Sequence, residues 1–184
     1  MPSLAVATLS KRLRDSGHEV TISDYNIFFH KFSSAIKYSA VDFSILSDEN
    51  ATLRYLTRNA DAKVFNAIEK VFWDWVRPEK AELYAFSLTP LDLYPELKLP
   101  VPGLKKKNLF VLNSSALIAS RAKKFFSGPV VIGNDELPKQ GYRDILGKYP
   151  CFDYAVYNRG ENSLLSLAGY LQTKGTRPSN VLER

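Results

Sequence analysis

The sequence predicts an α/β domain with a doubly wound, mostly parallel sheet flanked by helices. Short apolar segments that suit buried strands alternate with longer segments whose apolar residues recur at helical spacing. Residues 130–132 and 154–157 are strongly apolar, as expected for strands covered on both faces. Each is followed by a glycine-bearing polar turn. Ligands of open parallel sheets bind outside the carboxyl ends of the strands, so these turns are the first candidates for a site.

The N-terminal residues predict half of a strand–helix–strand unit. Apolar residues between Leu4 and Leu13 have helical spacing, Ser3 is a suitable N-cap, and Gly17 ends the helix. Residues 19–23 then alternate as a short strand. A parallel sheet normally begins with a strand before its first helix. We therefore expect that the true start lies upstream or that the sheet lacks its first strand.

The remaining elements follow from periodicity and from glycine and proline positions. The expected helices cover 27–38, 44–57, 60–76, 115–126, 142–149 and 162–173, and the expected strands cover 82–88, 130–132 and 154–157. Residues 91–107 are interrupted by prolines and predict a long loop, which in ordered domains is often functional. Residues 108–112 suit either a strand or an extended lead into the next helix.

Length and charge favour one soluble domain. We expect residues 1–175 to form that domain and residues 176–184 to be a linker that leaves it. The net charge is +6, but acidic residues lie among the basic ones, which favours a solvated surface over a nucleic-acid site. We find no apolar run long enough to span a membrane. The single cysteine, Cys151, cannot form an internal disulfide and suits a reducing cytoplasm.

The candidate ligand-binding residues lie at the ends of three predicted strands. They are Ser87, Leu88, Thr89, Gly133, Asn134, Arg159, Gly160 and Glu161. Glycine permits close backbone approach to a ligand, and the Ser87 and Thr89 hydroxyls suit hydrogen bonds to a cofactor. The structural alternatives are that Ser87 caps a strand end, that the glycine turns are ordinary strand-to-helix connections, and that Arg159 is simply exposed. Asp24 and Asn26 are weaker candidates.

A set of short segments occurs in a particular order along the chain. The segments are Pro2–Leu13, Ser16–Val20, Asp24–Asn26, Ala85–Ser87, Val130–Gly133, Asp153–Val156 and Arg159–Glu161. Together they resemble the N-terminal cobalamin-binding domain of the B12-dependent radical SAM enzymes. That family typically opens with a strand ending in Asn-Pro-Pro and continues with a Pro-Ser-Leu helix and a Gly-His-x-Val turn. Gly-Phe-Ser, Gly-Gly and Gly-Glu-Gly-Glu turns follow.

The resemblance implies a Rossmann-like fold of the cobalamin-binding type that holds base-off, His-off cobalamin. It also implies a downstream radical SAM domain, outside this chain, that carries the 4Fe–4S cluster and S-adenosylmethionine for methyl transfer or rearrangement. The substrate would be a peptide or a small molecule. His18 and His30 lack the Asp-x-His-x-x-Gly pattern of cobalt-ligating histidines, so a structural role is the better interpretation of both.

The sequence also departs from the family pattern. The opening Asn-Pro-Pro strand is absent, Asn134 replaces the second glycine of the Gly-Gly pair, and Arg159-Gly160-Glu161-Asn162 replaces Gly-Glu-Gly-Glu. A second hypothesis is therefore a cofactor-free domain of the same fold that serves as a docking or substrate-recognition module. A third is a free-standing enzyme that uses Asp24, Ser87 and Glu161. The lack of a recognisable nucleophile–base set makes it the least favoured.

An aromatic cluster closes one predicted helix. Phe72, Trp73 and Trp75 suit either the hydrophobic core or a surface for a partner, and helical spacing favours the core.

Overall fold

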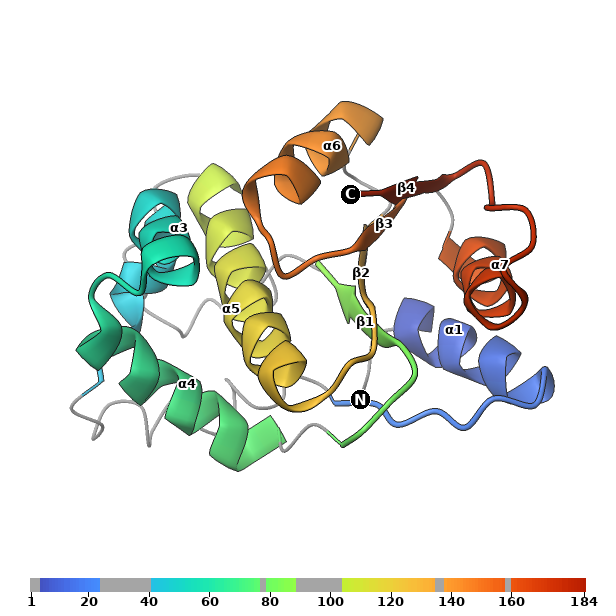
Figure 1. Ribbon diagram of the computed structural model, residues 1–184, viewed down its shortest axis with the longest axis horizontal. Helices are drawn as coiled ribbons and strands as arrows, with labels where there is room; N and C mark the ends of the chain where they lie inside the picture. Colours follow the sequence, from blue (N-terminus) through green and yellow to red (C-terminus); the bar gives the residue numbers. More distant parts are fainter. Residues whose placement is uncertain (1–3, 24–40, 77–78, 89–103, 135–137, 158–159) are drawn as a thin grey trace.

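A four-stranded sheet with helices on both faces organises the chain (Figure 1). The computed structural model describes residues 4–23, 41–76, 79–88, 104–134, 138–157 and 160–184. Its elements, in chain order, are α1 (Leu4–Asp15), η1 (Phe43–Ser47), α3 (Glu49–Arg58), α4 (Ala62–Val76), β1 (Tyr84–Ser87), α5 (Leu104–Phe125), β2 (Val130–Asn134), α6 (Lys139–Lys148), β3 (Tyr154–Tyr157), α7 (Gly160–Thr173) and β4 (Val181–Glu183). Among these residues no helix is long and apolar enough to cross a membrane.

The strands lie in the order β1-β2-β3-β4, and the first three are parallel. β4 pairs antiparallel with β3 at one edge. In this register Ser87, Gly133 and Val156 form one row across the sheet. The prediction of an α/β domain with a mostly parallel sheet is therefore confirmed for the described residues.

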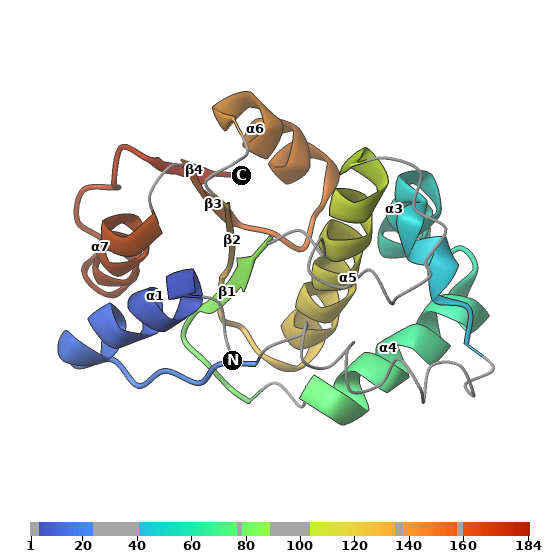
Figure 2. The same ribbon diagram turned by 180° about the vertical axis from the view of Figure 1, so that it is seen from behind.

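Alternating side chains divide the sheet into two apolar faces. On one face, Val130 and Ile132 are buried with residues of α5 and α6, such as Ala119 and Leu146. On the other, Val131 is buried with residues of α7. Figures 1 and 2 show the same division, with α5 and α6 on one side of the sheet and α1 and α7 on the other.

Helix α5 also supports a further helical layer on its side away from the sheet. Phe43 of η1, Phe65 and Phe72 of α4 are buried against Leu117 and other residues of α5. In Figure 1 the helices α3 and α4 accordingly lie beyond α5. Because this layer buries the outer side of α5, the helix is apolar on two sides rather than along one stripe.

Burial on two sides explains why the sequence did not predict the first half of α5. Residues 108–112 belong to α5, which begins at Leu104 instead of residue 115. Phe110 and Leu112 are buried in different clusters on the two sides of the helix, so their spacing gave no clear helical period. The extended alternatives for this segment were wrong.

The strand expected at 19–23 is not formed. These residues carry no strand pairing, and no strand in the described part of the sheet lies beyond β1 to receive them. The helix expected at 27–38 lies outside the described residues, as does most of the loop expected at 91–107.

The expectation that residues 176–184 form a departing linker was wrong for the last residues. Val181 is buried in the core beside Val156, and β4 completes the sheet. The backbone N–H of Arg184 donates to the carbonyl oxygen of Asp153 at 2.9 Å. Strand pairing at this edge is a long-range contact, which local composition does not reveal.

A close backbone approach makes Gly128 necessary just before β2. A Cβ at this position would lie 2.4 Å from the carbonyl oxygen of Ala81 and 3.0 Å from the ring of Tyr84. We predict that Gly128→Ala destabilises the fold by about 2 kcal/mol, because backbone must shift to relieve the overlap. Gly147→Ala in α6 is the matched control, since nothing lies within 4 Å of its added Cβ. Urea unfolding measures both, and equal stabilities of the two variants would contradict the prediction.

Candidate functional site

The carboxyl ends of β1, β2 and β3 form one rim of the sheet. Ser87 ends β1 with an exposed side chain, and Gly133 lies opposite it near the end of β2. Gly160 opens α7 shortly after β3. Because the three strands are parallel, the turns that the sequence singled out lie at the same edge. We call this edge the carboxyl rim.

The helices of the chain divide between the two faces of the sheet. Helix α5, which follows β1, covers one face of the sheet, whereas α1 lies on the opposite face with α7. In doubly wound sheets the ligand crevice lies outside the carboxyl ends of the strands where the winding reverses. The described strands follow the order of the chain, β1-β2-β3-β4, and contain no such reversal, so the rim is a candidate because it collects the carboxyl ends of β1, β2 and β3.

The two rim glycines have a different role from that of Gly128. A Cβ at Gly133 would lie 3.5 Å from the carbonyl oxygen of Val156, and one at Gly160 would lie 3.8 Å from a methyl group of Leu9. Both distances are ordinary van der Waals contacts. Packing among the described residues therefore does not require glycine at either position.

The other described candidate residues differ in burial and position. Leu88 is 7% exposed, so its side chain belongs to the core and is not available to a ligand. Its backbone N–H donates to the carbonyl oxygen of Gly133 at 3.0 Å and holds the two strand ends together. Glu161 is half-buried in the first turn of α7. Asn134 is the last residue of β2 and pairs with Tyr157.

Several candidates lie outside the described residues: Thr89, Arg159, Asp24, Asn26 and His30. His18 lies in the turn after α1, where its backbone N–H donates to Leu13 at 3.0 Å. Gly17 beside it has φ +87°, as a helix-ending glycine requires. The described residues contain no group of three or more His, Cys, Asp or Glu side chains placed to hold a metal ion.

One basic group at the rim was not predicted from the sequence. The Lys139 ammonium lies 5.2 Å from the ring centroid of Tyr157, the last residue of β3. The Tyr157 hydroxyl donates to the carbonyl oxygen of Ser179 at 2.7 Å, which fixes the ring. Lys139 begins α6 after Pro138, whose side chain makes no capping hydrogen bond. The sequence placed the start of this helix at residue 142, three residues too late, and so overlooked the lysine.

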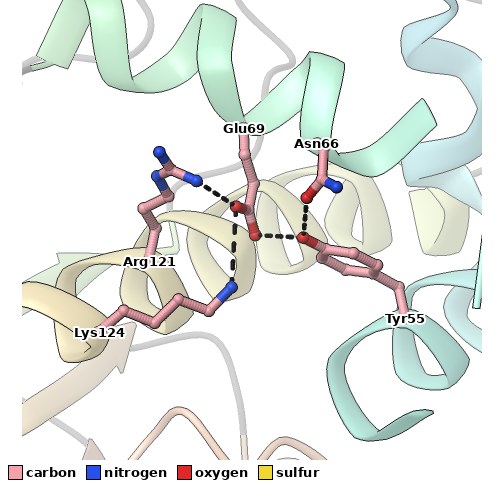
Figure 3. Close-up of polar contacts among 5 residues, drawn as sticks. All are labelled: Tyr55, Asn66, Glu69, Arg121 and Lys124. Atoms are coloured by element: carbon pink, nitrogen blue, oxygen red, sulfur yellow. Dashed lines mark hydrogen bonds and ion pairs between the residues drawn. The ribbon is translucent and has the colours of Figure 1, made fainter. Parts of the chain in front are cut away.

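The most connected polar cluster lies elsewhere, between α3, α4 and α5 (Figure 3). Glu69 is 2% exposed, and its Oε2 lies 3.2 Å from Arg121 Nη1 and 4.0 Å from Lys124 Nζ. The Tyr55 hydroxyl lies 2.9 Å from Glu69 Oε1 and 2.9 Å from Asn66 Oδ1. Burial, and then the hydrogen bond and charge of Glu69, raise the pKa of Tyr55 above its ordinary value.

This cluster is best explained as a structural tie. A phenol has one proton, so Tyr55 can donate to only one of its two neighbours. If it donates to Glu69, the Asn66 amide must turn its nitrogen toward the phenol oxygen and donate to it. The cations of Arg121 and Lys124 compensate the buried carboxylate of Glu69. The residues join three helices on the side of α5 away from the sheet, apart from the carboxyl rim.

No protein-family model matches the chain, and neither the curated proteins nor the solved structures include one significantly similar to it. The residues of the chain and their arrangement are therefore the basis for any functional assignment.

We predict that removing the charge of Glu69 destabilises the fold strongly. We expect Glu69→Gln to lower the free energy of unfolding by about 2 kcal/mol, because it leaves Arg121 without its buried counter-charge. Glu49→Gln is the matched control, since Glu49 pairs with Lys148 at 3.0 Å on the surface. We expect this change to cost about 0.5 kcal/mol or less. Chemical denaturation at neutral pH compares them, and a loss at Glu69 no larger than that at Glu49 would refute the structural tie.

We predict that the buried thiol of Cys151 makes the free energy of unfolding depend on pH in the alkaline range. Burial raises the pKa of its thiol from 9.0 to about 12. The folded state thus favours the protonated thiol, and this stability is complete below pH 9 and is lost as pH rises toward 12. We expect the stability of the wild type to fall by about 2 kcal/mol relative to Cys151→Ala between about pH 9 and about pH 11. Parallel curves for the two proteins in urea titrations would contradict this.

Proposed function

We propose that this chain is the N-terminal, non-catalytic domain of a B12-dependent radical SAM enzyme and holds cobalamin at the carboxyl rim. The fold would be of the Rossmann-like, cobalamin-binding type. The observation that supports the proposal most directly is the shared edge of Ser87, Gly133 and Gly160 at the ends of three parallel strands. The family resemblance of the surrounding segments supplies the identity of the ligand.

The residues of the rim fit the chemistry of such a ligand. Gly133 and Gly160 carry no side chain, which suits close approach of a ligand to the backbone. The Ser87 hydroxyl and the Glu161 carboxylate suit the amide groups that surround a corrin ring, and Lys139 suits its phosphate. We expect cobalamin to be held without a histidine ligand from this chain. Bound cobalamin would supply a transferable methyl group or a carbon radical.

The chain itself would bind and orient the cofactor, while a downstream domain would carry the iron–sulfur cluster and S-adenosylmethionine. The whole enzyme would methylate or rearrange a peptide or small-molecule substrate in the cytoplasm. A Cys-x-x-x-Cys-x-x-Cys motif after Arg184 in the same reading frame would establish this class of parent enzyme.

One observation favours a cofactor-free docking module as the second candidate. Helix α1 lies against the start of α7, where Arg12 contacts the side chain of Asn162 and Leu9 lies near Gly160. These contacts cover part of the α7 N-terminus that a cofactor phosphate would otherwise approach. A domain of this fold without a cofactor would then recognise its partner through another surface.

Hydroxocobalamin titration of the purified chain tests the first candidate. We expect saturable changes in the visible spectrum and, for Gly133→Leu, at least about tenfold weaker binding, because leucine adds bulk at a strand end that the cofactor must approach closely. Gly147→Leu is the matched control, because Gly147 lies in α6 with nothing within 4 Å of an added Cβ. We expect it to bind like the wild type. Absence of saturable binding, or equal binding by Gly133→Leu, would favour the cofactor-free candidate.

A further inference from the structure

A second surface of the chain combines an exposed and a partly buried aromatic ring with basic groups. Phe125 at the end of α5 is 58% exposed, and its ring centroid lies 5.0 Å from that of Trp73 in α4. Among the described residues, Phe125 and Val64 are the large hydrophobic side chains that remain exposed. We define the aromatic–basic patch as Trp73, Arg121, Lys124 and Phe125. The sequence predicted either a core position or a partner surface for Phe72 and Trp73. Phe72 lies in the core.

Arg121 holds the patch together. Its guanidinium carbon lies 5.5 Å from the ring centroids of both Trp73 and Phe125. The Nη1 group of Arg121 is also fixed by the buried carboxylate of Glu69. A guanidinium that is stacked and hydrogen-bonded loses little further freedom when a partner binds. The aromatic rings and the cation are thus arranged before any contact with a partner.

The charge of the patch is positive. Arg121 and Lys124 face a single carboxylate, Glu69, and the Lys124 side chain is 55% exposed. Lys123 does not add to this excess, because it pairs with Asp153 at 2.6 Å. A complementary partner therefore brings carboxylates around an apolar side chain. Arginine and aromatic residues are also the side chains that contribute most at protein interfaces.

The position of the patch separates it from the carboxyl rim. Helix α5 ends at Phe125, shortly before β2 begins at Val130, so its last turn lies near the amino ends of the strands. Phe126, which contacts Phe125, stacks near Tyr84 at the beginning of β1. A partner bound to the patch would thus leave the carboxyl rim accessible.

We propose that the aromatic–basic patch is a docking site for an acidic segment of a partner protein that inserts an apolar side chain beside Phe125. The carboxylates of the segment pair with Lys124 and with the exposed edge of Arg121. A second copy of this chain fits less well, because two chains of net charge +6 repel each other. The proposal does not depend on cobalamin binding.

Fluorescence anisotropy with two labelled peptides tests the docking site. The acidic probe carries four glutamates around a leucine–phenylalanine pair, and the control probe replaces the glutamates with lysines. We expect the acidic probe to bind the wild-type chain with a Kd below about 1 mM and the basic probe not to bind. Binding should weaken between about 50 mM and about 300 mM salt, since charges contribute to it.

Four variants locate the binding surface. We expect Phe125→Ser to weaken binding of the acidic probe about tenfold and Lys124→Gln to weaken it about threefold. Val64→Ser and Lys63→Glu change an exposed apolar and an exposed basic side chain of α4 outside the patch, and we expect binding within about twofold of the wild type. Thermal unfolding confirms that each variant is folded.

The proposal would be overturned by no saturable binding of the acidic probe, by equal binding of the basic probe, or by binding of Phe125→Ser and Lys124→Gln that equals the wild type. A loss at Val64→Ser as large as that at Phe125→Ser would also overturn it, because binding would then follow general hydrophobicity and not this patch.

Discussion

Helix α5 is the element on which the rest of the structure depends, because it must be buried on two sides at once. One side covers the sheet beside Val130 and Ile132, and the other carries the layer of η1, α3 and α4. A polar chain crosses the same region: the buried Asn113 of α5 donates to the carbonyl oxygen of Leu46 at 2.7 Å and accepts from the Tyr149 hydroxyl at 2.7 Å. Because both contacts are satisfied, this buried amide orients α5 between the two layers without the cost of an unpaired polar group.

The amino ends and the carboxyl ends of the strands differ in their side chains. At the amino edge, the Asp153 carboxylate accepts from the backbone N–H of Val130 at 2.8 Å and pairs with Lys123, which fixes β2 against β3. The carboxyl rim has small or absent side chains at Ser87 and Gly133. At the rim the backbone N–H of Leu88 donates to the carbonyl oxygen of Gly133, and Lys139 lies over the Tyr157 ring. The small side chain of Ser87 and the absent one of Gly133 support the proposal of a ligand at the rim.

The helical layer gives the chain a second place for recognition. Glu69 ties α4 to α5 and at the same time orients Arg121 toward Trp73 and Phe125. A buried carboxylate therefore supports an exposed cation, so that stability and surface chemistry share one residue. The rim and the aromatic–basic patch lie toward opposite ends of α5, which would let a cofactor and a partner protein bind the same domain together.

The sequence by itself determined the class of fold and most elements whose periods are simple. Residues 154–157 form β3 at the predicted bounds, and the amphipathic helices α4 and α7 lie within two residues of their expected starts, because one buried face leaves a clear apolar period. It also determined that the strand ends near Ser87, Gly133 and Gly160 share an edge, since parallel strands require it. Only the tertiary structure decided the length of α5, the loss of the strand at 19–23, the pairing of β4 and the position of Lys139 over Tyr157. These features depend on contacts between residues that are distant in the chain. The local apolar period of a segment carries no information on the free energy of such contacts.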